Sequence, residues 1–131
     1  MSSLRDHLFG SGDDALEPGQ FDTVEILVQR DAWRMSELAD ALRVDPSTAT
    51  RAVQRLQREG LAVRVPSDDD RRVVMVSATE AGRRRYEIIA RRRARFMRDV
   101  LAPFGPEERR QLGDLLERLV ASVDQVAARM P

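Results

Sequence analysis

Apolar residues recur at helical spacing through the first half of the chain, and the spacing changes after residue 60. Residues 21–31, 36–42 and 46–59 place apolar side chains three or four positions apart, which predicts three short amphipathic helices. From residue 61 to residue 65 the pattern alternates, as it does in a half-buried strand. Residues 72–78 are rich in β-branched side chains and predict the return strand of a hairpin.

Two longer helices are expected after the hairpin. Residues 80–102 carry apolar side chains along one stripe, and Pro103 ends that helix because proline lacks the N–H that a helix interior needs. Residues 106–129 form the second helix, whose apolar stripe consists of Leu112, Leu115, Leu116, Leu119, Val123 and Val126. So small a domain offers this stripe little else to pack against, and we expect it to join two copies of the chain.

Residues at the helix ends agree with this division. Ser36 is a good N-cap for its helix, and Asp45 caps the next one, with Pro46 at the first position, where a missing N–H costs nothing. Gly60 suits the left-handed conformation that ends a helix. Two short helices followed by a hairpin are the layout of a winged helix-turn-helix. The expected fold is therefore mainly α with a small β-hairpin wing, flanked by dimerisation helices.

Three segments are expected within one compact domain. Residues 1–20 contain several glycines, acids and a proline, so they predict a short or partly disordered N-terminal segment with at most a short helix. Residues 21–79 form the winged helix region, and residues 80–131 form the long-helix dimerisation region.

Composition excludes several classes of function. The 131 residues include no cysteine and one histidine, which leaves no disulfide, thiolate site or paired-histidine metal site. No glycine loop for phosphates and no nucleophile with a base is present, so we expect no enzyme, no metal and no cofactor. No apolar run reaches the roughly 20 residues of a membrane span, and the N-terminus does not resemble a signal peptide. We expect a cytoplasmic protein without a membrane partner.

The formal net charge is zero, but the charge is unevenly distributed. All 22 basic residues are arginine. Residues 71–98 hold ten arginines against two glutamates, whereas residues 1–35 hold three arginines against seven acids. This asymmetry fits a middle segment that faces an anion and fits a solvated helix surface equally well, so charge alone does not decide between them. The arginines at 91–95 lie farther from the wing, and we expect them to pair with the acidic terminal segments.

The helix over residues 46–59 has one apolar side and one polar side. Ala49, Val53 and Leu56 share the apolar side, with Ala52 beside them. The other side carries hydroxyl, amide and guanidinium groups and has no acid before Glu59. These groups hydrogen-bond phosphates and base edges in a major groove. The residues expected to contact DNA from this helix are Ser47, Thr48, Thr50, Arg51, Gln54 and Arg55.

The predicted hairpin tip adds a second candidate contact. Arg71 and Arg72 follow three aspartates, which is a poor arrangement for a simple anion site. It is reasonable if Asp70 holds Arg72 in a fixed direction, because an oriented arginine can enter a narrow minor groove, where the negative potential is enhanced. A surface salt bridge with no further role is the alternative interpretation.

The stretches at residues 35–39, 47–51 and 56–61, together with the run 70–82, closely resemble MarR-family transcriptional regulators. The resemblance covers about residues 20–127, and Ala78 stands where the family usually has leucine. It implies a homodimeric repressor or activator that binds a pseudo-palindromic double-stranded DNA operator and is often relieved by small phenolic or other aromatic ligands. It also implies that Arg72 is the minor-groove arginine, with Asp70 as its partner, and that residues 46–59 form the recognition helix.

Residues 1–20 depart from the family pattern, because members usually begin with a substantial helix that joins the dimer interface and lines the ligand pocket. The departure affects the expected effector site more than DNA binding, and it leaves the ligand-binding residues unassigned. We expect a DNA-binding regulator, and a repressor in particular. The alternative is a winged-helix protein-interaction module or antirepressor without an operator of its own, against which the intact polar helix surface and the Asp70–Arg72 pair both argue.

Overall fold

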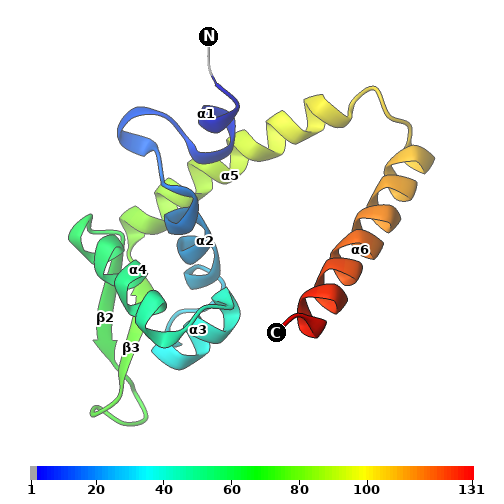
Figure 1. Cartoon of the computed structure of the whole chain (residues 1–131). Helices are drawn as coiled ribbons and strands as arrows, with labels where there is room; N and C mark the ends of the chain where they lie inside the picture. Colours follow the sequence, from blue (N-terminus) through cyan, green and yellow to red (C-terminus); the bar gives the residue numbers. More distant parts are fainter. Residues whose placement is uncertain (1–2) are drawn as a thin grey trace. The chain divides into compact units, whose positions relative to one another are not determined.

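The structure, a computed structural model, describes residues 3–131 and is mainly helical with one small antiparallel sheet (Figure 1). The predicted fold class, mainly α with a β-hairpin wing, is confirmed. Residues 1–94 and 95–131 form two compact units, and each is described by itself. Within the described residues, no helix is both long enough and apolar enough to cross a membrane.

Three helices and the sheet enclose the core of the first unit. The helices are α2 (Pro18–Leu27), α3 (Met35–Leu42) and α4 (Pro46–Arg58). Their apolar faces meet the inner face of the sheet and one turn of the long helix α5 (Glu80–Leu101). The largest fully buried side chains of this core include Phe21, Leu27, Leu38, Leu56, Leu61 and Ile89.

The sheet has three strands, one more than the hairpin predicted from the sequence. Strands β2 (Ala62–Pro66) and β3 (Val74–Ala78) pair antiparallel and form the wing, and β1 (Trp33–Arg34) pairs with the other edge of β3. A two-residue strand is too short to show periodicity, so no hydrophobic pattern predicted it. The wing also begins its return later than predicted, which places Arg72 in the turn and not in the strand.

Two helix starts differ from the sequence predictions. Helix α2 begins at Pro18 and not at Phe21, because Pro18 takes the first helical position while the Gln20 side chain accepts the Glu17 N–H (2.9 Å). The prediction of Ser36 as an N-cap is wrong. Helix α3 begins at Met35, directly after β1, and the Glu37 carboxylate accepts the Arg34 N–H (3.2 Å) in place of a capping hydroxyl.

The predicted ends of α4 are confirmed. Asp45 is the N-cap and accepts the Thr48 N–H (2.8 Å), while Pro46 occupies the first turn. Gly60 adopts a φ of 74° directly after the helix, a conformation that disfavours any residue with a Cβ.

The N-terminal segment contains the short helix α1 (Leu4–Phe9) and the 3₁₀ turn η1 (Gly12–Asp14). Two arginines of α5 hold it. Arg92 donates to the Asp6 carbonyl oxygen (3.4 Å) and to the Ser11 hydroxyl (3.3 Å). Arg93 donates to the Leu8 carbonyl, and its guanidinium lies 3.7 Å from the centre of the Phe21 ring. Cation–π and carbonyl contacts therefore hold the N-terminal segment.

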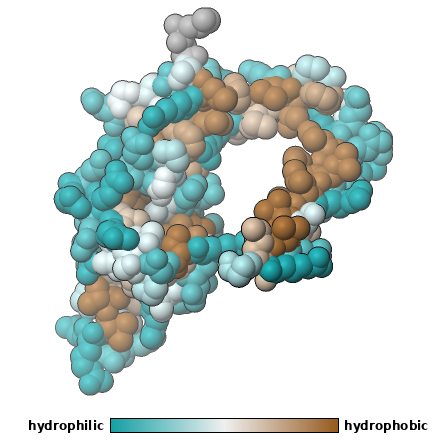
Figure 2. Space-filling model, viewed as in Figure 1, coloured by the Kyte–Doolittle hydropathy of each residue, from teal (hydrophilic) through white to brown (hydrophobic). Residues whose placement is uncertain are grey.

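The second unit contains the end of α5 and helix α6 (Pro106–Arg129). Arg109 closes the turn between them by donating to the carbonyl oxygens of Leu101 (2.8 Å) and Phe104 (3.0 Å). No side chain of α6 is buried, and Figure 2 shows apolar surface along this helix.

Gly82 generates the first prediction. Replacing glycine by alanine inside a helix ordinarily stabilises a protein by up to about 1 kcal/mol. At Gly82, however, a Cβ would lie 2.2 Å from the Leu61 carbonyl oxygen, so α5 would have to move away from the end of α4. We therefore predict that Gly82→Ala lowers the melting temperature by about 5 °C or more, measured by circular dichroism.

Gly19→Ala is the matched control, because Gly19 also lies in the first turn of a helix and a Cβ there would meet nothing within 4 Å. This variant should melt at or above the wild-type temperature. Equal stabilisation by both substitutions would contradict the close approach of α5 to Leu61.

Candidate nucleic-acid interface

The two sides of α4 lie as its sequence predicted. Ala49, Val53 and Leu56 have no solvent exposure and form its inner side. The opposite side is exposed or half-buried and carries the predicted polar set. These residues are Ser47, Thr48, Thr50, Arg51, Gln54 and Arg55. Helix α4 contains no acidic residue between Pro46 and Arg58, so its outer surface combines hydroxyl, amide and guanidinium groups.

The start of α4 is organised by one carboxylate. Asp45 Oδ1 accepts the Ser47 hydroxyl (2.6 Å) and the Thr48 N–H (2.8 Å). These hydrogen bonds, the one from Ser47 foremost, lower the pKa of Asp45 to about 2. The carboxylate stays ionised at neutral pH and occupies the Thr48 N–H at the helix start.

The hydroxyl and guanidinium groups of α4 differ in their availability. The Thr50 hydroxyl donates to the Pro46 carbonyl (2.9 Å), a bond within the helix. Arg51 makes a long contact to the Thr48 hydroxyl (3.4 Å), which leaves most of its five donors for a ligand. Arg51 and Arg55 are both exposed.

The predicted Asp70–Arg72 pair is present at the wing tip. Asp70 Oδ1 accepts the Arg72 backbone N–H (3.0 Å) and the Arg72 Nε–H (3.2 Å), and Oδ2 faces Nη2 at 3.4 Å. The backbone hydrogen bond, followed by the side-chain bonds, lowers the pKa of Asp70. The Arg72 side chain nevertheless remains 91% exposed. Asp70 therefore orients the guanidinium without burying it.

The wing tip around this pair is itself held by hydrogen bonds. The Val73 N–H donates to the Asp70 carbonyl (2.9 Å), and the Ser67 N–H donates to the Val73 carbonyl (2.8 Å). Arg71 lies in the same turn and is exposed. All three predicted wing residues are thus brought to one tip.

Arg83, the first of the three arginines at 83–85, contacts the chain next to α2 and takes no part in the wing tip. Its Nη1 donates to the Val28 carbonyl beyond the end of α2 (3.4 Å).

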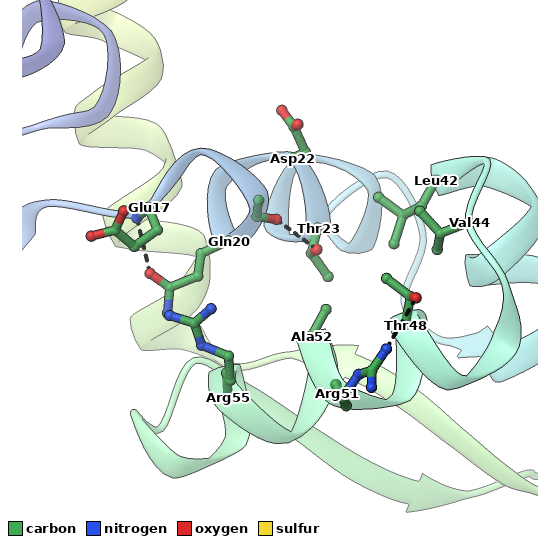
Figure 3. A pocket seen from close by; sticks show the side chains of 11 residues that line it. Glu17, Gln20, Asp22, Thr23, Leu42, Val44, Thr48, Arg51, Ala52 and Arg55 are labelled. Carbon is green, nitrogen blue, oxygen red and sulfur yellow. Dashed lines mark hydrogen bonds between the residues drawn. The ribbon is translucent and has the colours of Figure 1, made fainter.

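A groove between α2 and α4 was not predicted from the sequence (Figure 3). It has a volume of about 420 Å³, and its apolar lining includes Leu42, Val44 and Ala52. Its charged and polar lining residues are Glu17, Gln20, Asp22, Thr23, Thr48, Arg51 and Arg55. These residues come from separate segments, so no local pattern marks the groove. Within the described residues, no three acidic or histidine side chains gather as a metal ion would require.

Comparison with known proteins gives matches to bacterial regulators. A sequence model of the MarR family matches residues 16–74. The transcriptional regulator PecS of Dickeya dadantii is 32% identical over 107 residues, which cover 79% of this chain and 64% of PecS. The transcriptional repressor MdtR of Bacillus subtilis is 27% identical over 107 residues, covering 82% of this chain and 69% of MdtR.

Solved structures give the same result. A probable transcriptional regulator from Pseudomonas aeruginosa is 30% identical, with a TM-score of 0.70 over 88% of this chain and 85% of that one. The regulator PcaV of Streptomyces coelicolor, solved with its natural ligand, is 26% identical with a TM-score of 0.66 over 86% and 79% of the two chains.

Streptococcus pneumoniae FabT, solved in complex with DNA, has a TM-score of 0.80 over 93% of this chain and 85% of its own. At 24% identity it supports the fold alone. The family match, the named relatives and the winged-helix geometry agree on a regulator and not an enzyme. This chain belongs to the MarR family of DNA-binding transcriptional regulators.

Proposed function

We propose that this protein is a repressor that acts as a homodimer on a pseudo-palindromic double-stranded operator in the cytoplasm, and that a small aromatic or phenolic ligand releases it. The observation that carries the proposal is the acid-free outer surface of α4 in the same unit as an exposed, oriented Arg72. The repressor role is supported by the likeness to MdtR.

In this proposal α4 enters the major groove and the wing tip reaches the minor groove. Ser47, Thr48, Thr50, Arg51, Gln54 and Arg55 contact phosphates and base edges. Arg72 enters the minor groove, Asp70 orients it, and Arg71 approaches the backbone. An arginine already held in direction loses less conformational freedom on binding than a free one.

We predict that Arg72→Ala lowers affinity for a duplex selected from random sequence, with the fold and oligomeric state unchanged. If Arg72 neutralises one phosphate charge, the slope of log K against log salt falls by about 0.9. Fluorescence anisotropy at several salt concentrations gives both quantities.

Arg110→Ala is the control, because it removes the same charge from an exposed side chain of α6. It should leave the affinity near the wild-type value. Equal behaviour of the two variants would reject the assignment of Arg72. Failure of the selection to yield any duplex would favour the interaction-module alternative.

The apolar stripe of α6 supports the homodimer. Its six large side chains are between 39% and 59% exposed; they are Leu112, Leu115, Leu116, Leu119, Val123 and Val126. An exposed apolar surface of this extent is typical of a protein–protein interface. A second copy of the stripe is its natural complement, and two-fold symmetry then presents two copies of α4 to two half-sites.

We predict that Leu119→Arg converts the dimer to a monomer in sedimentation equilibrium, because it places a charge in the middle of the stripe. The secondary structure should persist, since Leu119 is 59% exposed within the chain. Ala121→Arg places the same charge on the opposite side of α6 and should leave the dimer intact. Dissociation by both variants, or by neither, would contradict the proposed interface.

The groove between α2 and α4 supports the effector. Its volume of about 420 Å³ suits a small molecule, and its lining combines apolar side chains with Arg51 and Arg55. An aromatic acid could place its ring against Ala52 and its carboxylate beside these arginines. Because both arginines belong to the proposed DNA surface, such a ligand would compete with DNA. PcaV, which has the same fold, binds a natural ligand.

We predict that a hydroxybenzoate from a screen of aromatic acids raises the melting temperature, since a ligand that binds only the native state stabilises it. Ala52→Leu fills the groove and should abolish the shift. A shift that persists in Ala52→Leu would place the effector elsewhere.

A further inference from the structure

The structure assigns a positioning role to Gln20, a residue that sequence analysis did not single out. Its side-chain amide ties the C-terminal end of α4 to the start of α2 and thereby sets the direction in which α4 meets DNA. This inference rests on the proposed function in one respect, the contact of α4 with DNA.

Gln20 is a buried polar residue with only 8% exposure. Burying an amide is unfavourable unless its donors and acceptor find partners. Here the Oε1 atom accepts the Glu17 N–H (2.9 Å) at the start of α2 (Figure 3), and Nε2 donates to Glu59 Oε2 (2.5 Å) at the end of α4. One side chain thus links two helix ends that lie 39 positions apart in the sequence.

Glu59 places a carboxylate at the C-terminal end of α4, where a negative charge is unfavourable. It is the C-cap of the helix, where the macrodipole is negative and a carboxylate is repelled. The donor that offsets this comes from outside the helix, from Gln20. A hydrogen bond to an ionised acceptor is roughly twice as strong as a neutral one, so this contact is the stronger of the two that Gln20 makes.

The Gln20 contact gives α4 a directional restraint, which the packing of its apolar side does not provide. Burial of Ala49, Val53 and Leu56 decides which side of the helix faces inward, but hydrophobic contact has no preferred direction. A hydrogen bond is directional and fixes the position of the atoms it joins. The bond from Gln20 to Glu59 therefore restrains the tilt of α4, at the end opposite to its Asp45 cap.

Gly60 and Leu61, which follow Glu59, are held by Thr79. The Thr79 hydroxyl donates to the Gly60 carbonyl (2.6 Å), and the Thr79 N–H donates to the Leu61 carbonyl (3.1 Å). The corner between α4 and the wing is thus held by α2 through Gln20 and by the start of α5 through Thr79. Loss of the Gln20 bond would free the helix side of this corner while the wing side stays in place.

Exchanging the partners tests the inference. In Gln20→Glu two carboxylates face each other and neither can donate, so the affinity for the selected duplex should fall about tenfold or more at pH 7.5. In Gln20→Glu/Glu59→Gln the amide at position 59 donates to the carboxylate at position 20, which still accepts the Glu17 N–H. Affinity should return to within about threefold of wild type.

Two controls separate positioning from charge and from phosphate contact. Gln29→Glu makes the same substitution at an exposed site beyond the end of α2 and should bind as wild type does. In Gln20→Glu the slope of log K against log salt should be unchanged, whereas Arg51→Ala should lower it by about 0.9. Gln20→Met covers the case in which Gln20→Glu does not fold, because it removes the donor without adding charge and should also weaken binding.

The inference is overturned if folded Gln20→Glu and Gln20→Met bind as wild type does, or if the double variant stays as weak as Gln20→Glu. Failure of the proposed DNA contact has a different signature, namely unchanged affinity in Arg51→Ala and Arg72→Ala. If those two variants weaken binding and the exchange series does not, α4 contacts DNA without needing Gln20.

Discussion

The burial of one side of α4 is the interaction on which the rest of the structure depends. Ala49, Val53 and Leu56 are buried against a core built from α2, α3 and the sheet. Once that side is inside, the helical period forces the residues between them outward. Hydrophobic burial leaves the tilt of the helix undetermined, and directional bonds at its two ends, from Asp45 and from Gln20, restrain it.

The arginines of this chain serve different purposes. Arg72 is held by Asp70 yet stays exposed, which suits contact with an external anion. Arg93 turns inward over Phe21 and holds the N-terminal segment. Arg109 closes the turn before α6 by donating to carbonyl oxygens. Net charge therefore says little about binding, because the surroundings of each guanidinium decide what it can reach.

Local signals predicted α4 and the wing tip well. The bounds of α4 follow from Asp45, Pro46 and Gly60, because capping depends on residues within a few positions of each other. The pairing of Asp70 with Arg72, two positions apart, is equally local. The failures involve partners distant in sequence. Ser36 is not a cap because β1 pairs with β3 and delivers the chain into α3 two residues earlier, with Arg34 at the N-cap.

The amino-acid sequence alone was enough to predict the succession of helices and hairpin, the inner and outer sides of α4, and the oriented arginine of the wing. Each depends on periodicity or on neighbours within about one helical turn. Three features appear only in the folded chain: Gln20 contacts Glu59, Arg93 lies over Phe21, and α2 and α4 leave a groove between them. These contacts join segments far apart in the chain, and their geometry exists only after the core has brought those segments together.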